Sequence, residues 1–208
     1  VPAIIANGPD WYSSIGTELT SGTKVLSLSG KIVRNGLVEV AMGTSLKKVI
    51  ESIGGGVPEN KKIKAIQIGG PMGGIVSAEN SDIPIDYETL KSMGVMMGSG
   101  GIIVMDQDTC MIDMAKFMMD FIQKGSCGKC IPCREGTRRM YEILENVTIR
   151  PKTESRHKTL ERFKGLMQLE SLAKVIKDTS LCGLGQTAAN PVLSTMKWFR
   201  DEIGRAHV

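Results

Sequence analysis

The sequence predicts an α+β fold with two domains: a small sheet domain of β-grasp type over residues 24–105 and a four-helix bundle over residues 106–208. The order strand, strand, helix, strand between residues 24 and 70 predicts the first domain. A change to helical periodicity after Asp106 predicts the second. The chain opens on an apolar run without an initiator methionine, so we expect it to be a fragment of something longer.

The predicted sheet domain contains four strands and one helix. Asn35-Gly36 is a typical hairpin turn before the second strand. Ser45 is expected to cap the helix, and the three glycines after Ile53 are expected to end it. The expected strands are residues 25–30, 37–40, 63–68 and 102–105, and the expected helix is residues 46–53.

Two glycine-rich segments, residues 69–74 and 98–101, could be taken for phosphate-binding loops. The first lacks the Lys-Ser/Thr pair of a P-loop, and a strand rather than a helix follows the second. Both are therefore interpreted as turns whose backbones pack tightly.

The second domain is expected to consist of four helices. An apolar stripe at spacings of three and four defines the first, with Asp108 or Thr109 as its cap. The last begins at Asn190-Pro191, a cap followed by proline at the first helical position. The stripe comprises Met111, Met114, Ala115, Met118, Phe121 and Ile122; the other helices are expected over residues 134–147, 157–177 and 191–203, with a polar loop at residues 150–155.

Composition excludes several classes of function. The net charge is only +4 and aromatic residues make up 4% of the chain, so nucleic acid is not an expected partner. No apolar stretch approaches the roughly 20 residues that span a bilayer, so direct membrane insertion is not expected. Of the five cysteines, three lie within seven residues, which favours metal ligation in a reducing compartment, by default the cytoplasm.

Four cysteines are the candidate ligands of one [4Fe–4S] cluster that passes single electrons. Cys127, Cys130 and Cys133 follow the C-x2-C-x2-C pattern, which wraps one face of the cube, and Cys182 on a distant glycine-rich turn closes the opposite corner. Zinc is a weaker alternative, because it usually takes two cysteine pairs or a Cys/His mixture. An incidental group of cysteines is the weakest. No catalytic residue and no other cofactor site are predicted.

The surroundings of these cysteines are expected to tune the cluster. Some of five nearby cations should favour its reduced, more negative state. Small residues should let backbone N–H groups point at the sulfurs, although glycines there can also serve only to permit tight turns. The cations are Lys124, Lys129, Arg134, Arg138 and Arg139 against the single acid Glu135, and the small residues are Gly125, Ser126, Gly128 and Gly183.

Three other residues with metal-binding side chains receive no ligand role. Cys110 is expected inside the first helix, as a small buried hydrophobe. His157 is expected to be solvated within a run of charges, and His207 to lie on a frayed tail.

Residues 126–136, 180–186 and 190–195 closely resemble the C-terminal half of the flavoprotein subunit of NADH dehydrogenases. That family includes the NADH-oxidising subunit of respiratory complex I and its relatives in NAD-linked and electron-bifurcating hydrogenases. The likeness extends through Gly69-Gly70-Pro71 and residues 98–106, and so covers nearly the whole chain. It implies a flavin- and NADH-binding domain, of which residues 1–23 are the tail, then a soluble-ligand-binding β-grasp domain, then a helical bundle with the cluster.

The resemblance also implies a route for electrons. NADH gives a hydride to FMN, the flavin releases electrons singly, and the cluster is the first stop towards further clusters in a quinone or hydrogenase chain. FMN and NAD are expected only in the full-length parent. Because the family's glycine-rich NADH and FMN loops have no match here, the chain alone is predicted not to oxidise NADH.

The implied partners are the missing flavin and NADH domain of the same chain and other iron–sulfur subunits of a multi-subunit complex. The implied location is cytoplasmic, or peripheral on the cytoplasmic face of a membrane complex. A different class of function is the alternative, in which the sheet domain is a ligand-binding or docking module and the cluster is purely structural.

Overall fold

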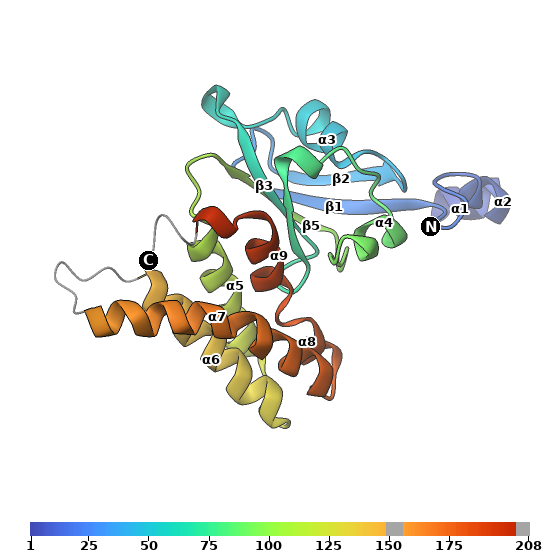
Figure 1. The fold of residues 1–208 in the computed structure, drawn as a ribbon. Helices are drawn as coiled ribbons and strands as arrows, with labels where there is room; N and C mark the ends of the chain where they lie inside the picture. Colours follow the sequence, from blue (N-terminus) through green and yellow to red (C-terminus); the bar gives the residue numbers. More distant parts are fainter. Residues whose placement is uncertain (149–155, 203–208) are drawn as a thin grey trace. The chain divides into compact units, whose positions relative to one another are not determined.

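A computed structural model describes residues 1–148 and 156–202, which form a mixed α/β structure. The chain divides into two units (Figure 1), the sheet unit Val1–Asp108 and the helical unit Thr109–Val208. The sheet unit contains five strands, and the described part of the helical unit contains helices alone.

The sheet is mixed, with the order β2-β1-β5-β3-β4. Its first and last strands along the chain, β1 and β5, pair in parallel at the centre, and the other neighbouring strands pair antiparallel. The strands are β1 (Thr23–Gly30), β2 (Gly36–Ala41), β3 (Ile63–Ile68), β4 (Gly74–Ser77) and β5 (Gly101–Asp106).

Short helical segments precede the first strand and connect the others. Ser45 caps α3 as predicted, because its hydroxyl accepts the Lys48 N–H at 3.4 Å. Before β1, the Tyr12 hydroxyl accepts the Thr23 N–H at 3.0 Å and so ties the N-terminal helices to the sheet. These segments are α1 (Pro2–Asn7), α2 (Pro9–Ser13), α3 (Leu46–Lys48), η1 (Val49–Ile53), η2 (Pro58–Asn60), η3 (Ala78–Asn80) and α4 (Tyr87–Ser92).

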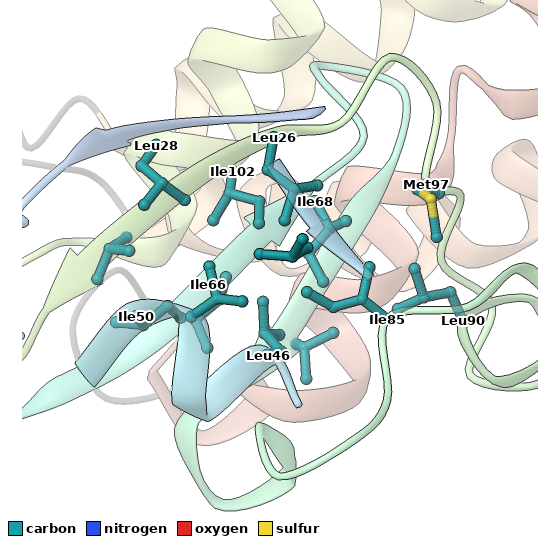
Figure 2. Packing of buried hydrophobic residues seen from close by; sticks show 14 of the residues in the cluster. Leu26, Leu28, Leu46, Ile50, Ile66, Ile68, Ile85, Leu90, Met97 and Ile102 are labelled. Carbon is teal, nitrogen blue, oxygen red and sulfur yellow. The ribbon is translucent and has the colours of Figure 1, made fainter. Parts of the chain in front are cut away.

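One hydrophobic cluster forms the core of the sheet unit (Figure 2). Leu46 and Ile50 of the α3–η1 segment lie beside the sheet residues Ile66, Ile68 and Ile102, and all five are at most 1% exposed. Full burial of each such side chain contributes about 1.5–3 kcal/mol. This packing holds the helical segment against one face of the sheet.

The predicted hairpin is confirmed, but its connection is longer than a tight Asn-Gly turn. The first strand ends at Gly30 and the second begins at Gly36, with Leu28 opposite Gly36 in the register. Ile32, inside the connection, is buried in the core cluster. Neither β4 nor α4 was predicted, since a four-residue strand and a six-residue helix are too short for periodicity to reveal.

The two glycine-rich segments pack tightly, as predicted, and they pack against each other. The Gly69 N–H donates to the Gly101 carbonyl at 2.8 Å, and the Met96 N–H donates to the Gly73 carbonyl at 3.1 Å. A Cβ atom on Gly69 would lie 1.8 Å from the Met96 carbonyl oxygen. No side chain fits between these backbones.

The described part of the helical unit contains the four predicted helices and one more. In the described residues, α6 packs against α5 and α7, and α9 contacts both α5 and α7. The predicted loop 150–155 and the predicted helix end at Ile203 lie outside the described residues. The helices are α5 (Met111–Gly125), α6 (Ile131–Thr148), α7 (Arg156–Thr179), α8 (Gly183–Thr187) and α9 (Asn190–Trp198). Among them, none combines the length and hydropathy that crossing a membrane requires.

Two expectations about α5 were wrong. Cys110 is the N-cap residue of α5, so it does not lie inside the helix. The cap is therefore neither Asp108 nor Thr109. Phe121, placed in the buried stripe, is 60% exposed. Met119 is buried although it was not part of the predicted stripe, because the buried face of α5 is wider than that stripe.

Candidate metal centre

The start of α6 positions two of the candidate ligands. Cys130 immediately precedes the helix, and its carbonyl accepts the Arg134 N–H at 3.1 Å. Pro132 fits the first turn, where no intrahelical bond needs its missing N–H. Cys133 therefore lies within α6, and the expectation that all three local thiols share one loop was wrong for this residue.

The sulfur of Cys130 joins the two cysteine segments. Backbone N–H groups of Leu181 and, to a smaller extent, Cys133 donate hydrogen bonds to it and lower the pKa of the thiol. Leu181 lies between α7 and α8, directly before Cys182. Two segments far apart in the sequence thus meet at this sulfur.

Cys133 is 5% exposed and contacts both segments. Its sulfur lies 3.3 Å from the Ser126 hydroxyl, which also accepts the Gly128 N–H at 3.3 Å. On the other side, a Cβ atom on Gly185 would lie 3.2 Å from the Cys133 Cβ and 2.4 Å from the Ser180 hydroxyl oxygen. Only glycine at position 185 permits this close approach.

Cys127 and Cys182 are exposed, and Cys182 is the N-cap residue of α8. Within residues 1–148 and 156–202, no three His, Cys, Asp or Glu side chains form a group that could hold a metal ion. The structure therefore brings the two cysteine segments together at Cys130 and Cys133 without gathering all four sulfurs. Cys110 lies at the other end of α5 from Gly125.

A buried serine tests whether these residues fit an iron–sulfur cluster. Ser180 is 6% exposed, and its hydroxyl has no hydrogen-bond partner of normal geometry among the described residues. Such a group costs about 1–3 kcal/mol unless it finds an acceptor. The hydroxyl contributes, as the smallest cause, to the lowered pKa of Cys130, so a thiolate at Cys130 would offer it an acceptor. With four thiols as the donor set, the residues fit the group.

The expected excess of positive charge is reduced, but not removed, by nearby carboxylates. Acids on the same helices, mostly one turn away, pair with four of the five cations. Lys129 is exposed, and the described residues show no ion pair for it. The pairs are Lys124–Asp120 at 2.6 Å, Arg134–Glu135 at 2.9 Å, and Arg138 and Arg139 with Glu142 at 3.3 Å each.

Arg134 has a second, structural role. Its guanidinium donates to the Gly128 carbonyl at 2.7 Å and so fixes the turn between Cys127 and Cys130. The backbone of Gly128 has φ +74, a left-handed conformation that favours glycine. This cation thus shapes the segment.

The hydroxyl groups of Ser126 and Ser180 were missed as functional candidates. A sequence signal for them exists, since each cysteine segment begins with serine, in Ser-Cys-Gly and in Ser-Leu-Cys-Gly. His157 is exposed as predicted, and its Nδ1 lies 3.6 Å from the Glu161 carboxylate. His207 lies outside the described residues.

Comparison with known proteins gives a consistent result. Residues 113–206 match the model of the NADH-ubiquinone oxidoreductase-F iron-sulfur binding region. The NADP-reducing hydrogenase subunit HndC of Solidesulfovibrio fructosivorans is 52% identical over 208 residues, which are 100% of this chain and 40% of that protein. In Rhizobium meliloti, the NADH-quinone oxidoreductase subunit designated F 2 is 35% identical over 98% of this chain and 46% of its own length.

A solved structure is also similar. In the crystal structure of an NAD⁺-reducing [NiFe]-hydrogenase in the H₂-reduced state, one chain superposes with a TM-score of 0.76 at 26% identity. The match covers 97% of this chain and 32% of that one. The chain thus spans less than half the length of each relative described here.

Proposed function

The chain belongs to the family of the NADH-quinone oxidoreductase-F proteins and their hydrogenase relatives, and from this premise we propose that it transfers single electrons through one [4Fe–4S] cluster. The predicted family resemblance is confirmed. The relatives are oxidoreductase subunits, and the matched region is an iron–sulfur binding region. The cluster would supply a one-electron couple.

Four thiolates would hold the group, from Cys127, Cys130, Cys133 and Cys182. The observation that supports this assignment is the close approach of the two segments, since a Cβ atom on Gly185 would lie only 3.2 Å from the Cys133 Cβ. The Leu181 and Cys133 N–H groups also favour the thiolate form of Cys130 that ligation requires. Rotation of the exposed Cys127 and Cys182 side chains would complete the set.

In a longer parent protein, electrons would arrive from FMN reduced by NADH and leave to further clusters of a quinone or hydrogenase chain. The partners in this proposal are a flavin and NADH domain of the same chain, ending in residues 1–23, and other iron–sulfur subunits. The location would be cytoplasmic, or peripheral on the cytoplasmic face of a membrane complex.

We also propose that residues 24–105 are a β-grasp domain of the soluble-ligand-binding type and that residues 106–208 are a four-helix bundle. The strand order, with a parallel central pair, supports the first assignment. The mutual packing of α5, α6, α7 and α9 supports the second, with α8 as an addition that carries the remote cysteine at its start.

Anaerobic redox titration tests the function. The chain, reconstituted with iron and sulfide, should bind about four irons and show reversible reduction by dithionite with a paramagnetic signal. A loaded but redox-silent chain would favour the alternative, a docking or ligand-binding module with a structural cluster. A chain that binds zinc in place of iron would refute the assignment.

NADH oxidation is not expected of this chain alone, because its glycine-rich segments 69–74 and 98–101 are closely packed turns. Incubation with NADH and ferricyanide should give no turnover above a control without protein. Turnover would place a nucleotide site within these residues.

A further inference from the structure

We propose that the hydroxyls of Ser126 and Ser180 donate hydrogen bonds to the thiolates of Cys133 and Cys130, and that these bonds raise the reduction potential of the cluster. The inference rests on the proposed function, in which those thiolates are ligands. It assigns a positioning and tuning role to two residues that neither the cysteine pattern nor the relatives' names identify.

The hydrogen bonds of Ser126 indicate that its hydroxyl proton is donated to the Cys133 sulfur. A serine hydroxyl has one donor and can accept two bonds. The Ser126 oxygen already accepts the Gly128 N–H at 3.3 Å, and the Cys133 sulfur lies 3.3 Å away. Once Cys133 is a thiolate it has no proton to give, so Ser126 must be the donor in this pair.

Ser180 lies beside the local cysteine segment, because a Cβ atom on Gly185 would lie 2.4 Å from its hydroxyl oxygen and 3.2 Å from the Cys133 Cβ. Its backbone is fixed on both sides, because its N–H donates to the Ile176 carbonyl at 3.1 Å and its carbonyl accepts the Gln186 amide at 3.1 Å. The hydroxyl is buried without a partner of normal geometry in the described residues. Gly185 leaves the space that this hydroxyl occupies, since a Cβ there would overlap it.

The two bonds act in the same direction on the redox couple. Reduction adds one negative charge, which spreads onto the thiolate sulfurs, so a hydroxyl proton stabilises the reduced state more than the oxidised state. The nearby cations are mostly paired with carboxylates, which weakens their competing influence. Removal of either hydroxyl should therefore make reduction harder.

The experiment measures the midpoint potential of the reconstituted full chain by dye-mediated titration with electron paramagnetic resonance. S126A and S180A should keep about four irons, and each should lower the equilibrium constant for one-electron reduction by about threefold to tenfold, where tenfold corresponds to 59 mV. S126T retains the hydroxyl and should restore the wild-type potential. S171A removes an exposed hydroxyl on α7 that bonds only the Gln168 carbonyl, and should leave the potential unchanged.

A second readout separates tuning from packing at position 180. S180A removes a buried hydroxyl that has no hydrogen-bond partner of normal geometry among the described residues. The iron-free variant should therefore unfold at the same or a higher urea concentration than the iron-free wild type, while its loaded form has the lower potential. A purely structural serine would instead weaken the iron-free chain and leave the potential of the loaded form unchanged.

Each outcome supports or contradicts the role proposed for the serines. An unchanged potential in a fully loaded alanine variant overturns the role of that serine. If S126A loses iron, S126T and S126V are compared: loading by threonine alone supports the hydroxyl's role, and failure of both overturns it. If the wild type itself holds no reducible four-iron cluster, it is the proposed function that fails.

Discussion

The four candidate thiols differ in exposure. Cys133 is buried against Gly185, Cys130 is half-buried beside Leu181, and Cys127 and Cys182 are exposed. Two thiols thus have fixed surroundings before any metal arrives, and two remain free to turn towards it. Replacement of Cys127 or Cys182 therefore tests the ligand set with little damage to the core.

Replacement of Cys182 with serine should degrade the cluster, whereas replacement of Cys110 should not. A hydroxyl is a poor substitute for a thiolate ligand of iron, and Cys110 lies at the far end of α5. Iron content and the broad absorption of the cluster, measured after anaerobic reconstitution, check this. Equal loss from both variants would contradict the ligand assignment.

In the iron-free chain, Cys130 should be alkylated at lower pH than an ordinary thiol. The Leu181 N–H, then the Cys133 N–H, lower its pKa, so more thiolate is present at a given pH. By linkage, this shift stabilises the folded chain at high pH, and the stability is lost as pH falls through the folded pKa.

Iodoacetamide labelling followed by peptide mass spectrometry gives the pH midpoint of Cys130. The same measurement in urea is the control, and the midpoint should rise there as the donated hydrogen bonds are lost. Equal midpoints in the folded and unfolded chain would show that the Leu181 contact does not form in solution.

For single residues, the spacing of the cysteines identified the candidate ligands but not the side chains that lie beside them. The C-x2-C-x2-C pattern has a direct chemical meaning, whereas the contact of Ser126 with Cys133 depends on the turn between α5 and α6, and the burial of Ser180 depends on the packing of α8 against α6 and α7. The cations were identified correctly, but their neutralisation depends on helical spacing to acids such as Glu142.

Among the elements, the paired glycine segments of the sheet unit have the strictest steric requirement. Gly69→Ala should lower the free energy of unfolding by roughly 2–4 kcal/mol, because its Cβ would overlap the Met96 carbonyl and its φ is +85. Gly70→Ala is the matched control: its φ is +76, but nothing lies within 4 Å of the added Cβ, so about 1–2 kcal/mol is expected.

Urea unfolding measures both variants in a Trp198→Phe background, which leaves Trp11 of the sheet unit as the single tryptophan. Similar losses in the two variants would mean that left-handed backbone strain alone accounts for the effect. A loss at Gly69 that exceeds the loss at Gly70 by a kcal/mol or more supports the close packing of the two segments.

Long elements could be predicted from the sequence and short ones could not. The helix α6 shows a repeating apolar face, so its existence was evident, but its start was placed at residue 134 because the three cysteines before it were assigned to one loop. Both β4 and α8 are too short for a period to develop. Cys182 was therefore assigned to a turn, although it directly precedes α8.

For the whole molecule, we expect metal removal to affect the two units unequally. The sheet unit contains none of the candidate ligands, whereas ligation in the helical unit adds its binding free energy to folding. Without iron, protection should fall first at residues 125–133 and 178–187, while the sheet around residues 24–70 stays protected.

Hydrogen exchange on matched iron-free and loaded samples measures this difference. Uniform changes across both units would show that they unfold as one cooperative system. Unchanged protection at both cysteine segments would show that the metal contributes nothing to their order.

The order of the sheet could not be predicted, although most of its strands could. The alternation in β1 and β3 and the apolar run in β5 indicate strands but carry no information about which strand pairs with which. The parallel pairing of Leu28 with Ile102 joins the two ends of the sheet unit and depends on the folded core.

That central pairing also sets an order of events during protein synthesis. Of the five strands, β1 leaves the ribosome first, but the sheet unit cannot complete its core until β5 has emerged. Until then, the side of β1 that pairs with β5 remains an unpaired strand edge. The thiols follow, and Cys182 cannot reach the other three until all of α7 has been made. The nascent chain therefore finishes its sheet before its metal ligands are complete.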